Sequence, residues 1–554
     1  MQPHKSGLLA FLGSGRGVHG SAARPLESLP PSALFSARGA DSMMLCVTSH
    51  AWLSPPPVVR TPRSAERRAI RACADAVTVS TFNLWCPEYR RVGDTRESSF
   101  PEMYTQRQKR LLRLPVWQES DIVCCQEFWY ASPDVFEMYV STLRRRFKMH
   151  GLQRSGRRPD GLFIAIAHEW EVLHEEDLDF DDVAGRCAQV LHIRRGVGGG
   201  GGGGGSGGGR GDAAASQTLN PSNLRLGDLG DADGVGGAGD AGRAGEAGDA
   251  DTEVNELLVA NVHLMFQHSD EVARVRLREM YKVLAALDRY KATLAAPPPT
   301  LICGDLNGPT GSVVADCLAR YGWRDSYSES SGCDVFSEDS CGWVSHLNHL
   351  GQAQGVDYIM VQSPSVPRRP AADWTDFVIQ EIAQALLELG LSDPEAAWQR
   401  FSRMARDKVW DVQGVVEDDD SVDGEGFKRA LRQLGFGAAP LTQREIDAVV
   451  ASCDNDGNGS IDAAEWRVRF AAAVERLQTD SGPLIQDQKD SRADLECVDS
   501  RLLPRCLESG EWPTEDEWGL SDHGVVTSTF VAQRRGEAEV TAWLQARSGE
   551  KKGS

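Results

Sequence analysis

Short apolar runs rich in β-branched residues recur along the chain from residue 77 onward, and most of them end in a polar or charged residue. Such runs predict β-strands at 77–85, 121–128, 160–166, 187–193, 256–264, 301–306, 356–360 and 520–527. Between some of them, apolar residues at helical spacing predict helices at 106–117, 132–147 and 270–290. Strands that alternate with helices predict an α/β domain.

Two stretches of unusual composition interrupt this pattern. Residues 1–74 are rich in Ser, Ala, Pro and Arg and poor in acids, which is typical either of a plastid or mitochondrial transit peptide or of a disordered extension without an address. Residues 196–252 are rich in Gly, Ala and Asp and have too few apolar side chains to form a core. We therefore expect a disordered insertion between two strands.

The interval between residues 357 and 521 is longer than the α/β domain needs, so a second module is expected inside it. A chain of 554 residues is also too long for a single core. The predicted organisation is a leader at 1–74, the first part of the α/β domain at 75–365, an inserted helical module at 375–478, a linker at 479–515, the last strand of the α/β domain at 516–535 and a tail at 536–554.

The inserted module contains a strong metal-binding motif at 454–465, Asp-Asn-Asp-Gly-Asn-Gly-Ser-Ile-Asp-Ala-Ala-Glu. It fits the twelve-position Ca²⁺ loop of an EF-hand, with Gly459 at the sharp turn. A loop that keeps its shape without metal is the alternative. The predicted ligands are the side chains of Asp454, Asp456 and Asn458, the backbone carbonyl of Ser460, Asp462 directly or through water, and both oxygens of Glu465.

EF-hands occur in pairs, and a degenerate partner is expected upstream. Val422 aligns with the central apolar position of the loop and Phe427 with the start of the exit helix. This register places Val415 at the first ligand position and Gly426 where the bidentate Glu belongs. The first hand is therefore expected to pair structurally without binding Ca²⁺, so the module holds one Ca²⁺ site. A helix capped near 392–394 is expected to enter it.

Charge and cysteine usage restrict the function classes. The net charge of −21 argues against broad, charge-driven binding of nucleic acid, although it leaves a local basic groove open. The thirteen cysteines follow no repeated spacing, which is typical of reduced, intracellular thiols. No apolar stretch is long enough to span a bilayer.

Polar residues at the predicted strand ends are the candidates for chemistry. Gly-Asp-Leu-Asn at 304–307 follows an apolar strand, but alone it is more typical of an ordinary solvated turn than of a catalytic site. Glu127 closes another apolar strand, and a carboxylate in that position is usually paired or bound to a metal. The further candidates are Asn83, Asp160, His263, Asp357, Asp522 and His523.

In their order along the chain, seven short motifs resemble the endonuclease/exonuclease/phosphatase superfamily. They are Thr-Phe-Asn at 81–83, Gln-Glu at 126–127, Asp-Gly at 160–161, Asn-Val-His-Leu at 261–264, Gly-Asp-Leu-Asn at 304–307, Val-Asp-Tyr-Ile at 356–359 and Ser-Asp-His at 521–523. Within the superfamily the chain looks most like the carbon-catabolite-repressor deadenylase and nocturnin branch, in particular its plant and algal members with EF-hands before the last motif. The resemblance implies an α/β fold of four layers, an αββα sandwich, with an inserted all-α EF-hand pair.

The resemblance also implies a metal-dependent phosphoester hydrolase. By the family pattern, Glu127 and the nearby Asn83 hold a Mg²⁺ ion, for which Mn²⁺ is an alternative, and it polarises the phosphoryl group. Asp522 supports the metal or the neighbouring histidine. Asp305 orients or deprotonates the attacking water.

The remaining residues are assigned by the resemblance to the substrate and to proton transfer. Asn307 and His263 hydrogen-bond the nonbridging oxygens, and Asp160 belongs to the substrate-binding set. His523, oriented by Asp357, is a proton-transfer partner or a phosphate ligand.

Three functions agree with these features. The first is a Mg²⁺-dependent nuclease that removes nucleotides from the 3′ ends of poly(A)-like RNA and carries a Ca²⁺-responsive insertion. The second is a phosphatase or phosphodiesterase of nucleotides, inositol phosphates or lipids, such as a sphingomyelinase, because fold and motifs do not choose among these substrates. The third is an inactive Ca²⁺-dependent interaction module. An intracellular location is expected, in a plastid or mitochondrion if the leader is an address and otherwise in the cytoplasm.

Overall fold

The computed structural model describes residues 76–196, 254–266, 272–309, 311–331, 343–366, 368–406, 421–438, 440–478 and 494–533. All of them belong to the second of two units of the chain, Val59–Ser554. The predicted leader at 1–74, the glycine-rich insertion at 196–252 except its first residue, and the tail at 536–554 lie outside the described residues. Among the described helices, none is long and apolar enough to cross a membrane.

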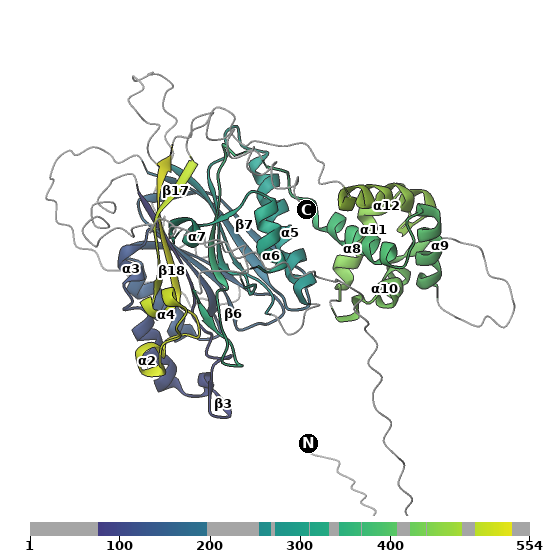
Figure 1. Cartoon of the computed structure of the whole chain (residues 1–554). Coiled ribbons are helices and arrows are strands. Elements are labelled where there is room, and N and C mark those ends of the chain that lie inside the picture. The colour runs from purple at the N-terminus through teal and green to yellow at the C-terminus, as the bar shows by residue number, and fades with distance from the viewer. Residues whose placement is uncertain are drawn as a thin grey trace, which may run out of the picture. The chain divides into compact units, whose positions relative to one another are not determined.

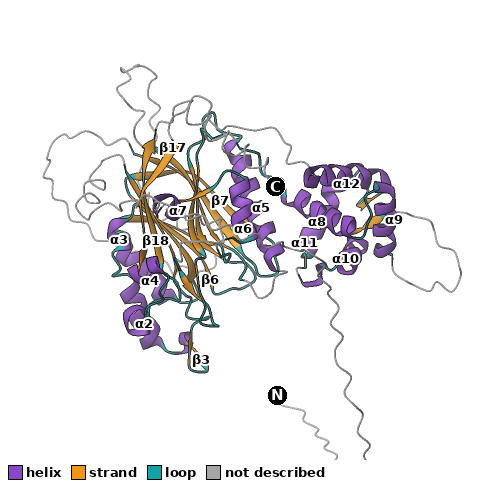
Figure 2. Cartoon of the chain, in the orientation of Figure 1, coloured by secondary structure: helices purple, strands orange, loops and turns teal. Residues whose placement is uncertain are grey.

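Two six-stranded mixed sheets form the α/β domain (Figures 1 and 2). In the first sheet, β1 at its centre is parallel to β4 and antiparallel to β18. Its strands, in order across the sheet, are β17 (Asp494–Leu503), β18 (Val525–Gln533), β1 (Val77–Asn83), β4 (Ile122–Trp129), β6 (Asp160–Ala167) and β5 (Phe147–Gln153).

The second sheet has β10 near its centre, parallel to β9 and antiparallel to β14. Its strands are, in order, β11 (Arg324–Asp325), β14 (Asp357–Gln362), β10 (Thr300–Asp305), β9 (Glu256–His263), β8 (Cys187–Arg195) and β7 (Trp170–Asp179). Buried apolar side chains from both sheets, such as Val123 and Ile302, belong to one core. The sheets therefore bury their apolar faces against each other.

Helices flank both sheets, which makes this a mixed α/β domain, as predicted. Figure 1 shows α2, α3 and α4 beside the first sheet and α5 and α6 beside the second. The helices are α2 (Pro101–Leu111), α3 (Val116–Glu119), α4 (Pro133–Leu143), α5 (Val272–Lys291), α6 (Val313–Arg320), α7 (Ser326–Ser331) and α13 (Glu515–Trp518), with 3₁₀ turns η1 (Glu97–Ser99) and η6 (Arg505–Ser509). Two short ladders complete it, β2 (Arg91–Val92) with β3 (Thr95–Arg96) and β12 (His346–Leu347) with β13 (Ala353–Gln354).

Several predicted element boundaries are wrong. The predicted linker at 479–515 contains β17, which pairs along its length with β18, and the predicted helix at 132–147 ends at Leu143 before β5 begins at Phe147. Strands β5, β7 and β17 have no counterpart in the prediction. They are edge strands, or next to an edge, with many polar residues, so their conformation depends on pairing with a distant partner more than on local pattern.

The inserted module at 375–478 is helical, as predicted, and has its own apolar core. Val422 of β15 (Val422–Asp423) pairs with Ile461 of β16 (Ser460–Ile461), which confirms the register predicted for the two loops. Residues 407–420, which include the first half of the first loop, lie outside the described residues. The helices are α8 (Trp374–Glu388), α9 (Pro394–Ala405), α10 (Gly424–Gln433), α11 (Gln443–Cys453) and α12 (Ala463–Gln478), with a 3₁₀ turn η5 (Phe436–Ala438).

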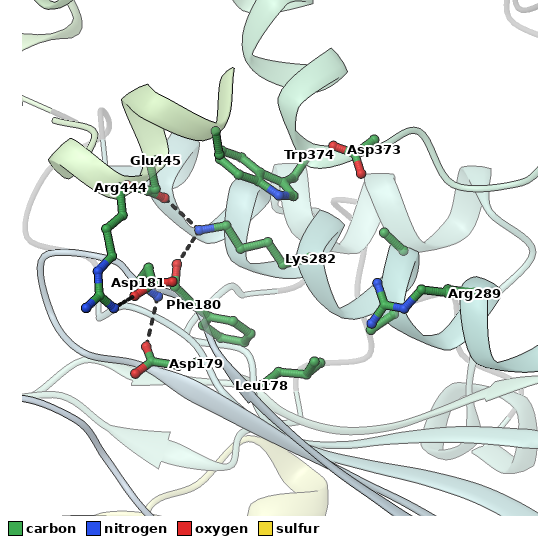
Figure 3. A pocket seen from close by; sticks show the side chains of 13 residues that line it. Leu178, Asp179, Phe180, Asp181, Lys282, Arg289, Asp373, Trp374, Arg444 and Glu445 are labelled. Carbon is green, nitrogen blue, oxygen red and sulfur yellow. Dashed lines mark hydrogen bonds and ion pairs between the residues drawn. The ribbon is translucent and has the colours of Figure 1, made fainter. Parts of the chain in front are cut away.

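The start of α11 contacts the α/β domain at α5 and at the loop between β7 and β8 (Figure 3). The Glu445 carboxylate accepts a hydrogen bond from Lys282 Nζ at 2.7 Å, and Lys282 also donates to the carbonyl of Phe180. Arg444 pairs with the Asp181 carboxylate at 2.6 Å. The entering helix of the predicted Ca²⁺ loop is therefore attached to the β7–β8 loop.

Candidate active site

Most of the predicted site residues converge at one cavity of about 880 Å³. They come from the ends of β4, β9 and β10 and from the loop before β18, so both sheets contribute. Asn83 and Asp357 are buried and contact this group through hydrogen bonds. The predicted residues that line the cavity are Glu127, His263, Asp305, Asn307, Asp522 and His523.

Asp305 is the centre of the hydrogen-bond network. Its Oδ2 accepts a hydrogen bond from Asn83 Nδ2 at 3.2 Å, and its Oδ1 accepts one from the backbone N–H of Asn307 at 2.8 Å. Asn307 lies in the left-handed region at φ 48°. Gly304, at φ 145°, leaves no room for a Cβ, which would lie 1.9 Å from the Val262 carbonyl oxygen. The Gly-Asp-Leu-Asn sequence is thus matched to a sharp turn that presents the carboxylate.

His523 and Asp357 form a buried pair. Nδ1 of His523 lies 2.8 Å from Asp357 Oδ2, and its Nε2 lies 3.6 Å from Asp305 Oδ2. Burial disfavours the imidazolium, but Asp357 and Asp305 outweigh burial and raise the pKa of His523 to about 10. The ring is therefore protonated at neutral pH, with Nδ1–H donating to Asp357.

His263 has the opposite protonation state. Its Nε2 lies 3.5 Å from Asp305 Oδ2. Burial holds the pKa of His263 well below its usual range, and the nearby cations Arg186 and Arg154 lower it further. One neutral and one charged imidazole thus face the same carboxylate.

Glu127 is presented by an irregularity in β4. It has φ 56°, at a shift in the β4–β6 register between Cys125 and Phe128, so its side chain turns away from the regular alternation. Its Oε2 accepts a hydrogen bond from the backbone N–H of Cys86 at 2.9 Å. Burial raises the pKa of Glu127, and the neighbouring Asp160 raises it further.

The buried carboxylates are arranged as expected for a divalent cation site. Burial raises the pKa of Asp305 to about 6 and that of Asp522 to about 7. Asp357 Oδ1 and Asp522 Oδ1 have no hydrogen-bond partner in the described part of the chain. Buried carboxylates that repel one another are stabilised by a hard cation, and carboxylate and carboxamide oxygens are the ligands that Mg²⁺ and Mn²⁺ prefer. Asp305, Asp357 and His523 have ligand atoms within 4.8 Å of one another, as do His346, Asp522 and His523, so these groups could hold a divalent cation. Glu127 and Asn83 remain the predicted ligands.

Asp160 is placed differently from its predicted role in substrate binding. Both of its oxygens accept hydrogen bonds from Arg154, at 3.0 and 3.1 Å, and Oδ1 also accepts one from the Tyr89 hydroxyl at 2.5 Å. Asp160 is fully buried, whereas Tyr89 and Arg154 line the cavity. The contacts give Asp160 a positioning role for these two side chains.

Several cavity residues were not predicted as site residues, and three of them are buried basic side chains. Arg186 and Arg154 line the cavity from two loops, and His346 stacks on His523 with ring centroids 4.1 Å apart. Burial lowers the pKa of His346 to about 2, and the neighbouring His523 contributes. None of the three ends an apolar strand. The pattern that indicated the other site residues, an apolar run that ends in a polar residue, could therefore not indicate these three.

The loop at 454–465 has the predicted turn geometry. Asp454 accepts hydrogen bonds from the backbone N–H of Gly457 and Gly459, both at 2.7 Å, and Gly459 has φ 84°. The Glu465 carboxylate accepts from the backbone N–H groups of two loop residues, 455 and 462. Oxygens of Asp454, Asp456 and Glu465 lie within 4.8 Å of one another. These carboxylates can hold one cation; Asn458, Ser460 and Asp462 remain predicted ligands.

Comparisons with known proteins give relatives by sequence and similar solved structures. No protein-family model matches the chain. A protein of Arabidopsis thaliana, described as an uncharacterized calcium-binding protein, is 26% identical over 469 residues, which cover 82% of this chain and 84% of that protein. The chain is also similar to the human Nocturnin catalytic domain with bound sulfate, with 13% identity, 53% of this chain and 84% of that chain covered and a TM-score of 0.33. It is also similar to ANGEL2, a 2′,3′-cyclic phosphatase, with 14% identity, 52% of this chain and 84% of that chain covered, and a TM-score of 0.33. TM-scores this low carry no argument about this chain.

Proposed function

We propose that the chain is a divalent-metal-dependent phosphoester hydrolase of the endonuclease/exonuclease/phosphatase superfamily. The observation that carries the proposal is the cavity in which Glu127, Asp305 and His523 meet, supported by Asn83 and Asp357. Phosphoester hydrolysis needs charge neutralisation at the phosphate, a positioned water and a proton donor, and these side chains supply all three.

Glu127 and Asn83 would hold the metal ion, with Asp522 in support. The ion supplies charge stabilisation at the phosphoryl oxygens when it is bound. Glu127 is suited to this because it lines the cavity, where its Oε2 accepts the backbone N–H of Cys86 and its Oε1 lies 4.0 Å from His263 Nε2.

The residues on the other side of Asp305 would bind the phosphate and move the proton. His263 is neutral and Asn307 is held by the carbonyl of Leu264, so both are oriented for nonbridging oxygens. Asp305 is oriented by two hydrogen bonds toward a water. His523 carries a proton at neutral pH, which suits it to protonate the leaving oxygen or to bind the phosphate.

The substrate we propose is RNA with a poly(A)-like 3′ end, because the motifs are most similar to the deadenylase and nocturnin branch. A nucleotide, inositol phosphate or lipid phosphoester is the alternative, which the net charge of −21 favours. An inactive Ca²⁺-dependent interaction module is the third candidate function.

We further propose that the helical module is an EF-hand pair with one Ca²⁺ site and that Ca²⁺ regulates hydrolysis. The relative from Arabidopsis thaliana, whose name calls it calcium-binding, supports the first part. The contacts at Glu445 support the second, because α11 leads into the loop at 454–465 and its first turn is bound to Lys282 of α5. A Ca²⁺-dependent movement of α11 would act on the β7–β8 loop, which lines the cavity.

The test is hydrolysis of labelled oligo(A) and of bis(p-nitrophenyl) phosphate at fixed Mg²⁺, with Ca²⁺ either chelated or supplied. The variant Asp305→Asn is expected to lose about a thousandfold in kcat. Asp325→Asn is the matched control, because Asp325 is equally buried but hydrogen-bonds Ser328 away from the cavity. Stepwise shortening of oligo(A) supports the RNA proposal.

Cleavage of the small diester alone would favour the alternative substrates, and cleavage of neither would leave the inactive module. Equal turnover with and without Ca²⁺ would contradict the proposed regulation.

A further inference from the structure

Arg186 is a buried cation, and two of its three guanidinium nitrogens have no hydrogen-bond partner in the described residues. Only 8% of its surface is exposed, and its Nε and Nη1 atoms make no hydrogen bond. Its backbone is held firmly: the N–H donates to Asp182 Oδ1 at 2.9 Å, and the carbonyl accepts from Phe180 N–H at 3.1 Å. A buried guanidinium normally satisfies its five donors, because an unpaired buried charge is costly. The fold therefore holds Arg186 in a position that a ligand can complete.

The guanidinium belongs to the same cavity as the candidate catalytic residues. Arg186 lines the cavity together with Glu127 and His263, and its positive charge acts on the pKa of both. Nearby acids do not take up its donors. Asp182 accepts from two backbone N–H groups, and Glu279, whose pKa is raised well above its usual range by burial and by Asp182, accepts from a third.

Other arginines extend this region of the cavity. Arg154 lines it with its side chain anchored to Asp160, and the exposed Arg91 and Arg158 lie at its rim. Arg154 and Arg158 share the loop between β5 and β6, and Arg91 is in β2. Together with Arg186 they make a local basic surface on a chain with a net charge of −21. A locally positive region of this kind attracts a polyanion despite the overall charge.

We propose that Arg186 binds a second phosphate of the substrate, next to the phosphate that is cleaved. A guanidinium presents its donors in a planar fork that matches two phosphate oxygens. The inference rests on the proposed hydrolase function and narrows it: the preferred substrates are phosphoesters that carry at least two phosphates, such as an oligonucleotide backbone.

The experiment compares two dinucleotides that differ by one phosphate. ApA has a single internal phosphate, and pApA carries an additional 5′-phosphate. Wild type, Arg186→Gln, Arg186→Lys and Arg194→Gln are assayed with both in Mg²⁺. Arg194 is the matched control, because it lies in β8, the strand that follows Arg186, but is exposed and paired with Glu171. Thermal unfolding of each variant reports its folding.

Arg186→Gln is expected to reduce kcat/KM for pApA about tenfold more than for ApA, mainly through KM. Arg186→Lys should recover part of the difference, and Arg194→Gln should show none. An equal reduction for both substrates, or no reduction, would overturn the proposal.

Calorimetric titration with inorganic pyrophosphate and inorganic phosphate separates this inference from the proposed function. Wild type is expected to bind pyrophosphate more tightly than phosphate, and Arg186→Gln should remove that preference. If neither dinucleotide is cleaved but this preference depends on Arg186, the hydrolase function fails while the anion site stands. If cleavage occurs and the preference is the same in Arg186→Gln, the anion site fails alone.

Discussion

Replacing Asp357 by Asn removes the negative charge that faces His523 and preserves the shape of the side chain. The carboxylate is fully buried, and its Oδ2 lies 2.8 Å from His523 Nδ1. An amide in its place can present either its oxygen or its NH₂ group to the ring, but it no longer stabilises the imidazolium. We therefore expect both stability and activity to fall.

The magnitude follows from the pKa of His523. It rises from an ordinary 6.5 to about 10 in the folded protein, and Asp357 and Asp305 share the effect. At about 1.4 kcal/mol per pH unit, this pKa shift corresponds to a stabilisation of the imidazolium by roughly 5 kcal/mol. Because Asp305 shares the effect, this value is an upper limit for the contribution of Asp357 alone. Because the folded pKa is raised, this stabilisation is fully present below pH 6.5 and is lost as the pH rises through about 10.

The assay is urea unfolding of the metal-free protein at pH 6, 8 and 10. Asp357→Asn is expected to lower the free energy of unfolding by about 3–5 kcal/mol at pH 6 and by progressively less toward pH 10. Asp325→Asn is the control, since burial raises the pKa of Asp325 to about 6, so the effect of this substitution on the free energy of unfolding should change by only about 0.5 kcal/mol between pH 6 and pH 10.

Activity gives a second readout for Asp357→Asn. With Mg²⁺, kcat on bis(p-nitrophenyl) phosphate should fall by about 10²–10⁴, because the orientation and charge of His523 are lost. A destabilisation that is the same at pH 6 and pH 10 would refute the charged pair. Activity close to that of wild type would refute its role in the reaction.

Two further predictions concern the helical module. Glu465→Gln should weaken Ca²⁺ binding by about a hundredfold in calorimetry, because the bidentate ligand of the loop is lost. Glu425→Gln, in the degenerate hand, should leave one Ca²⁺ site of unchanged affinity. Two Ca²⁺ sites in the wild-type protein would contradict this prediction. Burial raises the pKa of Glu381 from 4.5 to about 7, and the nearby Arg278 and Arg274 only partly offset it. The burial of Glu381 therefore lowers the free energy of unfolding as the pH rises from 4.5 to 7. The stability of Glu381→Gln relative to wild type should be about 3 kcal/mol greater at pH 8 than at pH 4. A relative stability that does not change with pH would contradict the raised pKa of Glu381.

The candidate site was predictable to the extent that its residues end apolar strands. Asn83 and His263 end β1 and β9, Asp305 ends β10, and Asp357 begins β14. A run of apolar residues that stops at a polar one is visible in one dimension, and the edge of a sheet brings such positions together. Asp160 begins a strand in the same way, but its carboxylate is paired with Arg154, a contact that the pattern did not indicate. Its part in substrate binding stays a prediction.

Residues on loops and edges could not be found in this way. Arg186 precedes a strand, and its burial and missing hydrogen bonds exist only after the β7–β8 loop has folded around Asp182. The strand β17 was predicted as a linker because its pattern is mixed, and it is ordered by pairing with β18 across the chain. Long-range pairing overrides weak local preference.

The sequence by itself determined the features that depend on neighbouring residues. The loop at 454–465 contains its predicted ligands and its turn within twelve positions, and the apolar runs with polar ends specify strands and their candidate chemistry. Tertiary structure alone decided which charges are paired and which face the cavity. Both properties depend on burial. The pKa of His523 and the unsatisfied donors of Arg186 are set by groups that lie far apart in the chain and meet only when the two sheets and their loops pack.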